Sequence, residues 1–276
     1  IVPIMGQSVL RTSHGVKVET KAACVELECF SSSIIRVKKY PLGQAPEKQS
    51  LSVTMQPEKV KYKIQEANNQ VILTTSELTV LLDIIQNQVR FVTKDGKELL
   101  AEKPSSTGFT SFNDAGNSTY RIRQTFLLDS DEAIYGLGQL QNGKMIQRNM
   151  TKNLIQGNVE DVSPFFQSTK GYGVFWDNYS PTLFTDNEVE TSFRSEVGDC
   201  VDYYFMYGKN ADGVIAQVRS LTGQAPMFPL WTYGYWQSKE RYKSQKEVVD
   251  VVRKYRELGI PLDGIIQDWQ YWGHNY

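Results

Sequence analysis

Hydrophobic and polar residues alternate in short runs over most of the first two hundred residues of the chain. The runs are VKVETKAACVELECF (16–30), IIRVKKYP (34–41), the segment 61–100, YRIRQTFLLD (120–129), GYGVFWDN (171–178) and CVDYYFMYG (200–208). Turn-forming residues interrupt them at hairpin spacing, as in ANNQ (67–70) and KDGK (94–97). Because no long amphipathic helix lies between the runs, the pattern predicts a mainly β chain that begins with an antiparallel β-sandwich.

The period of the pattern changes after Tyr207. The stretch NADGVIAQVRSLTG (210–223) predicts a short helix that ends at Gly223. The predicted buried face of this helix consists of Val214, Ile215, Val218 and Leu221. The proline-rich stretch APMFPL (225–230) indicates a linker, and we place the domain boundary there. The first domain is expected at residues 1–225 and the second at 226–276.

The second domain has the pattern strand, helix, strand. LWTYGYWQS (230–238) and LDGIIQDW (262–269) predict the strands, and the helix is expected from Ser244 to Leu258. Ser244 and Glu247 have the spacing of a capping box at the helix start. The predicted buried stripe consists of Val248, Val251, Val252, Tyr255 and Leu258. A β-α-β unit of this size predicts two parallel strands, the second of them buried.

Aromatic and acidic residues gather where these two strands end. Ligands in α/β folds bind beyond the carboxyl ends of the strands, which here are Gln237–Ser238 and Asp268–Trp269. Four of the five tryptophans lie in this region, at positions 231, 236, 269 and 272. From position alone, Asp268 is compatible with a catalytic carboxylate, a ligand anchor or a helix cap, and the tryptophans are more typical of plain core packing than of a binding site.

Composition and charge exclude several classes of protein. The net charge of −1 gives no field that would gather nucleic acid or an anionic membrane, and no apolar run has membrane-spanning length. Cys24 and Cys29 have odd separation in one strand and should face opposite sides. His14 and His274 are far apart in the sequence, so neither a metal site nor a cofactor is expected. Because the chain starts at Ile1 without a leader, we expect a sequence trimmed at its front.

Three blocks of sequence together resemble glycoside hydrolase family 31, which contains α-glucosidases and α-xylosidases. The blocks are IYGLGQLQ (134–141), SPFFQSTKGYGVFWDNYS (163–180) and the segment 225–273, which starts APMFPLWTYGYWQSKERY and ends DGIIQDWQYWG. They occur in family order and at family spacing. The resemblance implies a galactose-mutarotase-like β-sandwich followed by a (β/α)8 barrel, of which this chain holds the first β-α-β.

The resemblance also implies hydrolysis of α-glycosidic bonds with retention of configuration. The family uses two aspartates on later barrel strands, one as nucleophile and one as acid/base, and neither lies in this sequence. Retention requires both carboxyls about 5 Å apart across the scissile bond. We therefore expect no catalytic residue in this chain, no hydrolysis by the chain alone, and an N-terminal fragment of a longer enzyme.

Substrate-binding residues carry over from the family position by position. Asp268 matches the aspartate that hydrogen-bonds sugar hydroxyls in the −1 subsite, and Trp269 matches the next residue, near the C5 substituent. α-Glucosidases of the family usually read Asp-Ile-Asp-Tyr-Met here, whereas this chain reads DWQYW (268–272). That version resembles the α-xylosidase branch, and we also expect Trp272 to contact substrate. Gln156 and Asn158, in the polar stretch 141–162 that matches a loop over the active site, are further expected contacts.

The predicted function is the N-terminal part of an α-xylosidase that releases xylose from xyloglucan-type oligosaccharides. The alternatives are an α-glucosidase of the same family and a noncatalytic carbohydrate-binding sandwich. The expected partners are an oligosaccharide and the remaining barrel segment, with homo-oligomerisation left open and no nucleic acid or membrane span. By analogy with glycan-scavenging family members, we expect a bacterial periplasmic or secreted location.

Overall fold

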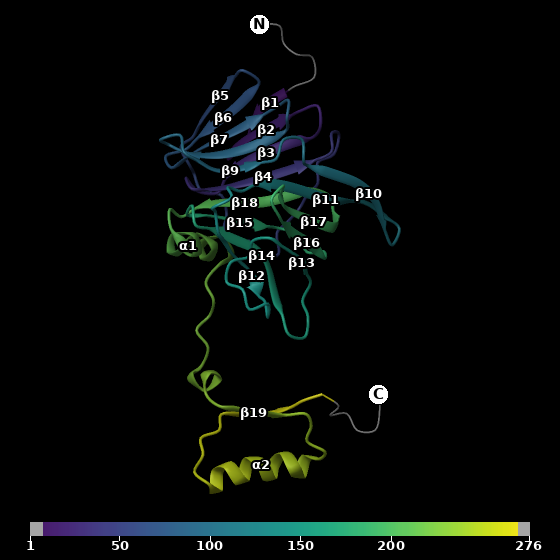
Figure 1. The fold of residues 1–276 in the computed structure, drawn as a ribbon, viewed down its shortest axis with the longest axis vertical. Coiled ribbons are helices and arrows are strands. Elements are labelled where there is room, and N and C mark those ends of the chain that lie inside the picture. Colours follow the sequence, from purple (N-terminus) through teal and green to yellow (C-terminus); the bar gives the residue numbers. More distant parts are fainter. Residues whose placement is uncertain (1–7, 270–276) are drawn as a thin grey trace. The chain divides into compact units, whose positions relative to one another are not determined.

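The computed structural model describes residues 8–269 and divides into two compact units. The first unit ends at Gln224 and the second begins at Ala225 (Figure 1).

The first unit is a sandwich of two antiparallel sheets, as the alternating pattern predicts (Figure 1). The eight-stranded sheet has the order β1 (Ser8–Arg11), β2 (Gly15–Glu19), β3 (Cys24–Cys29), β4 (Ile34–Tyr40), β18 (Val201–Tyr207), β15 (Tyr172–Trp176), β14 (Asp161–Ser168), β12 (Ile134–Gln139). The ten-stranded sheet has the order β13 (Met150–Leu154), β16 (Thr182–Asp186), β17 (Thr191–Gly198), β11 (Asn117–Leu127), β9 (Glu98–Glu102), β8 (Gln88–Thr93), β7 (Leu78–Asp83), β6 (Gln70–Thr74), β5 (Lys63–Ala67), and β10 (Gly108–Asp114) pairs with β11.

Aromatic side chains from both sheets interlock in the core between them. The rings of Phe91 on β8 and Phe205 on β18 stack with centroids 3.9 Å apart. The Trp176 indole on β15 stacks on Phe193 of β17 at 5.4 Å and donates a hydrogen bond of 2.9 Å to Ser195 Oγ. The buried indole is therefore both packed and satisfied as a donor, which fixes how the two sheets face each other.

Helix α1 (Ala211–Thr222) packs on the outer face of the eight-stranded sheet. The Asn210 side chain caps it by accepting a hydrogen bond from the Gly213 backbone N–H. Val214 and Leu221 are buried as predicted, but Ile215 is 43% exposed. The predicted face was thus one residue too wide, because Ile215 lies at the edge of the stripe that faces the sheet. With α1 on one side and the second sheet on the other, β18 is buried on both faces.

The polar stretch 141–162 is not one continuous loop. Residues Met150–Leu154 form strand β13, which pairs with β16 at the edge of the ten-stranded sheet. Polar residues dominate this edge strand, so its two apolar positions, the half-buried Met150 and the buried Leu154, gave no clear strand pattern. The expectation of a long loop was therefore wrong for residues 150–154 and for Asp161 and Val162, which begin β14.

The three cysteines are free and buried. Cys29 packs in the core between the sheets, whereas Cys24 packs beside Tyr40 and Cys200 on the other face, as the odd spacing predicts. Burial raises the pKa of the Cys29 and Cys200 thiols to about 12. The thiols are therefore packing groups and not nucleophiles.

A buried charge network fastens the irregular segment 41–62 to the eight-stranded sheet. Asp202 on β18 receives two hydrogen bonds from the Arg36 guanidinium, of 2.9 and 2.8 Å, and an ion pair of 2.9 Å from Lys48. Lys48 also pairs with Asp177 at 3.2 Å. Burial alone would raise the pKa of Asp202, but the hydrogen bonds and charges of Arg36 and Lys48 outweigh it and hold that pKa below its usual value.

We expect Asp202→Asn to lower the free energy of unfolding by about 2 kcal/mol at neutral pH, because it removes a charged acceptor of hydrogen bonds. A lowered folded-state pKa contributes stability that is present above the unfolded pKa of about 3.9 and is lost as the pH falls through the folded value. The difference between wild type and variant should therefore shrink below about pH 4. Urea unfolding at neutral and acid pH measures it, with the exposed Asp161→Asn as control. A difference that grows on acidification would contradict this assignment.

The second unit contains one β-α-β motif. A 3-10 turn, Leu230–Tyr233, is followed by β19 (Trp236–Lys239), α2 (Gln245–Glu257) and β20 (Gly264–Gln267). The two strands are parallel, with Trp236 opposite Gly264 and Lys239 opposite Gln267, which confirms the predicted motif. The expected strand start at residue 230 was wrong, because the chain after Pro229 turns before it extends.

The start of α2 is capped by two side chains. The Ser244 hydroxyl accepts a hydrogen bond from the Glu247 N–H, and the Glu247 carboxylate accepts one from the Lys243 N–H, one residue before the expected capping-box partner.

The apolar faces of this unit are only partly covered. No residue of α2 is fully buried, Leu258 is 60% exposed and Ile266 on β20 is 42% exposed. The predicted buried stripe and buried strand are therefore half-buried here, since a single helix covers only one face of two parallel strands.

Candidate functional site

The candidate site lies at the carboxyl end of β20. Asp268 follows the last strand residue directly and is exposed, and Trp269 beside it is 51% exposed. Asp268 Oδ1 accepts a hydrogen bond of 2.6 Å from the Trp269 backbone N–H, so the carboxylate shapes the turn that leaves the strand. A carboxylate and an indole next to each other offer hydrogen-bond acceptors and a flat apolar face, which suit a sugar ring.

The loop after β19 approaches this strand end. The Gln267 side-chain amide donates a hydrogen bond of 2.9 Å to the Tyr242 backbone carbonyl. The Lys239 ammonium lies 5.4 Å from the centre of the Tyr242 ring and forms an ion pair of 3.0 Å with Glu247 at the start of α2. These contacts hold the loop 240–243 against the residue that precedes Asp268.

Two polar atoms at this position are buried without a hydrogen-bond partner among residues 8–269. They are the Tyr242 hydroxyl and the Gln267 side-chain oxygen. Buried polar groups are normally satisfied, so both mark a place where further polar groups, of protein or ligand, fit. Sequence reasoning missed Tyr242 and Gln267, although the position of Gln267 directly before Asp268 was a usable signal.

The other predicted substrate contacts divide into two groups. Trp272 lies outside the residues that the structure describes. Gln156 and Asn158 lie in the sandwich unit, both exposed, in the segment between β13 and β14. The Gln156 amide both donates to and accepts from the Val162 backbone, at 3.1 and 2.9 Å. In the structure, Gln156 therefore closes its own loop, and its role as a substrate contact stays a prediction, as does that of Asn158.

Within residues 8–269, no group of three or more histidine, cysteine, aspartate or glutamate side chains has the arrangement of a metal site. Over the same residues, neither helix is long and apolar enough to cross a membrane. The chemistry that the described part of the site offers is thus binding, through Asp268, Trp269 and the polar atoms around them.

Comparison with protein families matches both units. The model of the glycosyl hydrolase 31 N-terminal galactose mutarotase-like domain matches residues 24–184, and that of the glycosyl hydrolases family 31 TIM-barrel domain matches residues 225–276.

Individual relatives match most of this chain but only part of their own length. An α-xylosidase of Saccharolobus solfataricus is 39% identical over 258 residues, covering 90% of this chain and 35% of the relative. Alpha-glucosidase 2 of Bacillus thermoamyloliquefaciens is 28% identical over 276 residues, covering 94% of this chain and 34% of the relative. The crystal structure of a GH31 α-xylosidase from Xanthomonas citri superposes with a TM-score of 0.86 at 23% identity, over 96% of this chain and 46% of that one. This chain spans about a third of the length of the two curated relatives.

Proposed function

Because this chain belongs to glycosyl hydrolase family 31, we propose that it forms the N-terminal part of a retaining α-xylosidase. The chain comprises the family's sandwich domain and the start of its TIM barrel. The observation that carries the proposal is the exposed pair Asp268–Trp269 at the carboxyl end of β20, the edge of a barrel where ligands bind. The 39% identity to the α-xylosidase of Saccharolobus solfataricus supports the same substrate class.

In this proposal Asp268 binds vicinal hydroxyls of the sugar in the −1 subsite. A carboxylate accepts two hydrogen bonds at once, and charge-assisted bonds are the stronger kind. The carboxylate is exposed and keeps one oxygen free of its local bond to Trp269, which supports a role toward a ligand.

Trp269 selects between sugars by size. Glucose carries a hydroxymethyl group on C5, whereas xylose carries only hydrogen there. An indole in that space packs against the smaller ring and collides with the larger one, so the proposed preference for xylose comes from exclusion of glucose. Trp272, on the same segment, is proposed to extend this wall.

The nucleophile and the acid/base are proposed to come from later barrel strands that this sequence does not contain. The fraction of each relative that the chain covers supports this division, and so do the half-covered faces of α2 and β20. The remaining barrel segment is thus the proposed partner of the second unit.

An α-glucosidase is the second candidate. The observation that favours it is the match of Alpha-glucosidase 2 over 94% of the chain, slightly more than the α-xylosidase covers. Both candidates share the family chemistry and differ only in what the C5 pocket admits. A carbohydrate-binding sandwich without catalysis is the third, and the barrel start in residues 225–276 weighs against it.

Turnover of p-nitrophenyl α-xyloside and α-glucoside by the full-length enzyme tests the proposal. We expect wild type to prefer the xyloside, and Trp269→Ile to shift the ratio of the two kcat/KM values toward glucoside by about 10-fold or more, the effect of one or two carbons in a pocket. Trp231→Ile is a matched control, because Trp231 is also 51% exposed but lies in the 3-10 turn before β19, where its ring contacts Trp236 at the start of that strand and not at the carboxyl end. A wild-type preference for glucoside, or an unchanged ratio in Trp269→Ile, would reject the α-xylosidase.

A further inference from the structure

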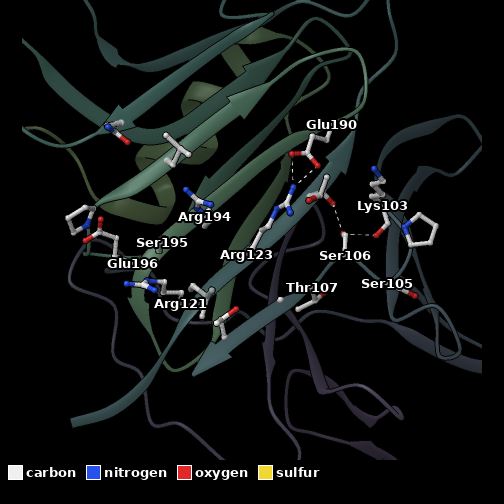
Figure 2. Close-up of a pocket in the computed structure, with 18 of the residues that line it drawn as sticks. Lys103, Ser105, Ser106, Thr107, Arg121, Arg123, Glu190, Arg194, Ser195 and Glu196 are labelled. Atoms are coloured by element: carbon white, nitrogen blue, oxygen red, sulfur yellow. Dashed lines mark hydrogen bonds and ion pairs between the residues drawn. The ribbon is translucent and has the colours of Figure 1, made fainter. Parts of the chain in front are cut away.

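A groove on the outer face of the ten-stranded sheet has no assigned role. Figure 2 shows it between β10, β11 and β17, with the segment that precedes β10 along its other side. Its volume is about 810 Å³, within the range of small-molecule sites. Four basic side chains line it against two acidic ones: Lys103, Arg121, Arg123 and Arg194 against Glu190 and Glu196. The groove is thus positive on a chain whose net charge is −1.

Strand register places two of these arginines directly opposite each other. Arg123 on β11 pairs with Arg194 on β17, and both project away from the core because Ile122 and Phe193, which alternate with them, are buried. Like charges directly opposite on adjacent strands disfavour the pairing. The pairing of Arg123 with Arg194 therefore does not contribute to the stability of the sheet.

Among the residues that the structure describes, only one arginine of this pair is neutralised. The Arg123 guanidinium binds both carboxylate oxygens of Glu190 at 2.6 Å (Figure 2). Arg194 is exposed and, among the described residues, has neither an ion pair nor a side-chain hydrogen bond.

Arg121 is held in place but not neutralised. Its guanidinium carbon lies 4.5 Å from the centre of the Phe112 ring, so the aromatic face orients it. It has no ion pair with any acidic residue in the range 8–269. Two guanidinium groups, from Arg121 and Arg194, are thus presented in one groove without an ion pair among the described residues, although the Glu196 carboxylate lines the same groove.

We propose that this groove binds a carboxylate-bearing sugar, a uronic acid unit of an oligosaccharide. The planar fork of arginine matches a carboxylate with two parallel hydrogen bonds. Asn153 lies in line with Arg194 across neighbouring strands of the sheet, and Thr110 lies opposite Arg121. Their amide and hydroxyl groups are available to bind the sugar's own hydroxyls. The residues of this site belong to the sandwich unit, whereas Asp268 and Trp269 belong to the second unit.

The lining distinguishes this ligand from two others. No aromatic residue lines the groove, so a neutral sugar would lack the flat ring on which such ligands usually pack. Protein partners are usually recognised through aromatic anchors at the centre of the interface, and no aromatic residue lines this groove. Charge is the recognition element that remains, and it calls for an anion.

Isothermal titration of the full-length protein with trigalacturonic acid tests the proposal. We expect binding to wild type, weakening by about 10-fold or more in Arg194→Gln because a charged hydrogen bond is lost, and no measurable binding of the neutral maltotriose. Arg253→Gln, which removes the same charge from the exposed face of α2, should bind trigalacturonic acid like wild type. Xyloside turnover by Arg194→Gln should stay at the wild-type level. A failure of the groove proposal can therefore be distinguished from a failure of the proposed α-xylosidase function.

Three outcomes would overturn the groove assignment. They are absence of trigalacturonic acid binding by wild type, equal binding by wild type and Arg194→Gln, and equal binding of maltotriose. A hexaglutamate peptide that bound as tightly as the sugar acid would reassign the groove to an acidic protein segment. Because Arg194 is exposed, its replacement should leave the fold intact, and circular dichroism of the variant checks this.

Discussion

Replacing Lys39 by methionine should lower the free energy of unfolding by about 4 kcal/mol, because it leaves a buried carboxylate without its counter-charge. Lys39 and Glu102 are both fully buried, and the Lys39 ammonium lies 2.5 Å from the Glu102 carboxylate. Burial lowers the pKa of Lys39, and the charge of Glu102 offsets part of that effect. Losing one partner of such a pair costs far more than losing both.

The pair sits at a junction of the two sheets. Besides Glu102 on β9, the Lys39 ammonium on β4 donates to the Asn87 carbonyl at 2.8 Å. The Glu102 carboxylate in turn accepts from the Val89 N–H at 2.6 Å and from the Tyr203 hydroxyl at 2.9 Å. Four strands, two from each sheet, therefore meet at one ion pair.

Two further variants test whether the loss of stability comes from leaving the buried Glu102 carboxylate without its counter-charge. Lys38→Met removes the neighbouring lysine, whose ion pair with Glu26 is partly exposed, and should cost about 1 kcal/mol or less. Lys39→Met combined with Glu102→Gln removes both charges and keeps an acceptor for Tyr203, so it should regain part of the lost stability. Urea unfolding followed by far-ultraviolet circular dichroism measures all three. If Lys39→Met costs no more than Lys38→Met, the buried pair is not the junction described here.

The architecture of the sandwich could be predicted from the chain, because strand alternation is a local property. In IIRVKKY (34–40), alternation alone puts Ile35, Val37 and Lys39 on one face, and the structure buries all three. What the sequence could not give is the partner of Lys39, since Glu102 lies 63 positions away and meets it only through the register of the whole sheet.

Local signals also explain the misplaced elements. The strand expected from residue 230 starts late because Pro229 precedes a 3-10 turn, and the aromatic residues of LWTY suit either conformation. Strand β13 was missed because an edge strand with mostly polar residues has no clear period. The turn is held by local hydrogen bonds, from Thr232 to the Pro229 carbonyl and from Gly234 to the Trp231 carbonyl, whereas β13 forms through its pairing with the distant strand β16.

In the candidate site, too, the sequence predicts some features and not others. Asp268 could be placed at a strand end because GIIQ (264–267) is a short apolar run flanked by a glycine and a carboxylate. The contact between Gln267 and Tyr242 could not, because it joins a strand to a loop 25 residues earlier. The groove arginines were not predicted either, since the opposition of Arg123 and Arg194 exists only in the paired register of β11 and β17.

Asp268→Ala in the full-length enzyme should lower kcat/KM for the xyloside by about 10²- to 10³-fold. The proposed carboxylate holds sugar hydroxyls through charged hydrogen bonds, and truncating one partner of such a contact costs about 2–5 kcal/mol. The fold should tolerate the change, because Asp268 is exposed and its bond within the protein is to the adjacent Trp269 N–H. Steady-state kinetics on p-nitrophenyl α-xyloside measures the loss.

The conservative variant separates charge from shape. Asp268→Asn keeps an acceptor oxygen but loses the charge, so its kcat/KM should fall between wild type and Asp268→Ala. Asp250→Ala, which removes an exposed carboxylate paired with Lys246 on α2, should leave kcat/KM unchanged. If Asp268→Ala retains kcat/KM within a factor of about three, a difference too small for a lost charged contact, Asp268 does not hold the sugar. The strand end would then be structural, and Tyr242 and Gln267 would be the next side chains to examine by substitution.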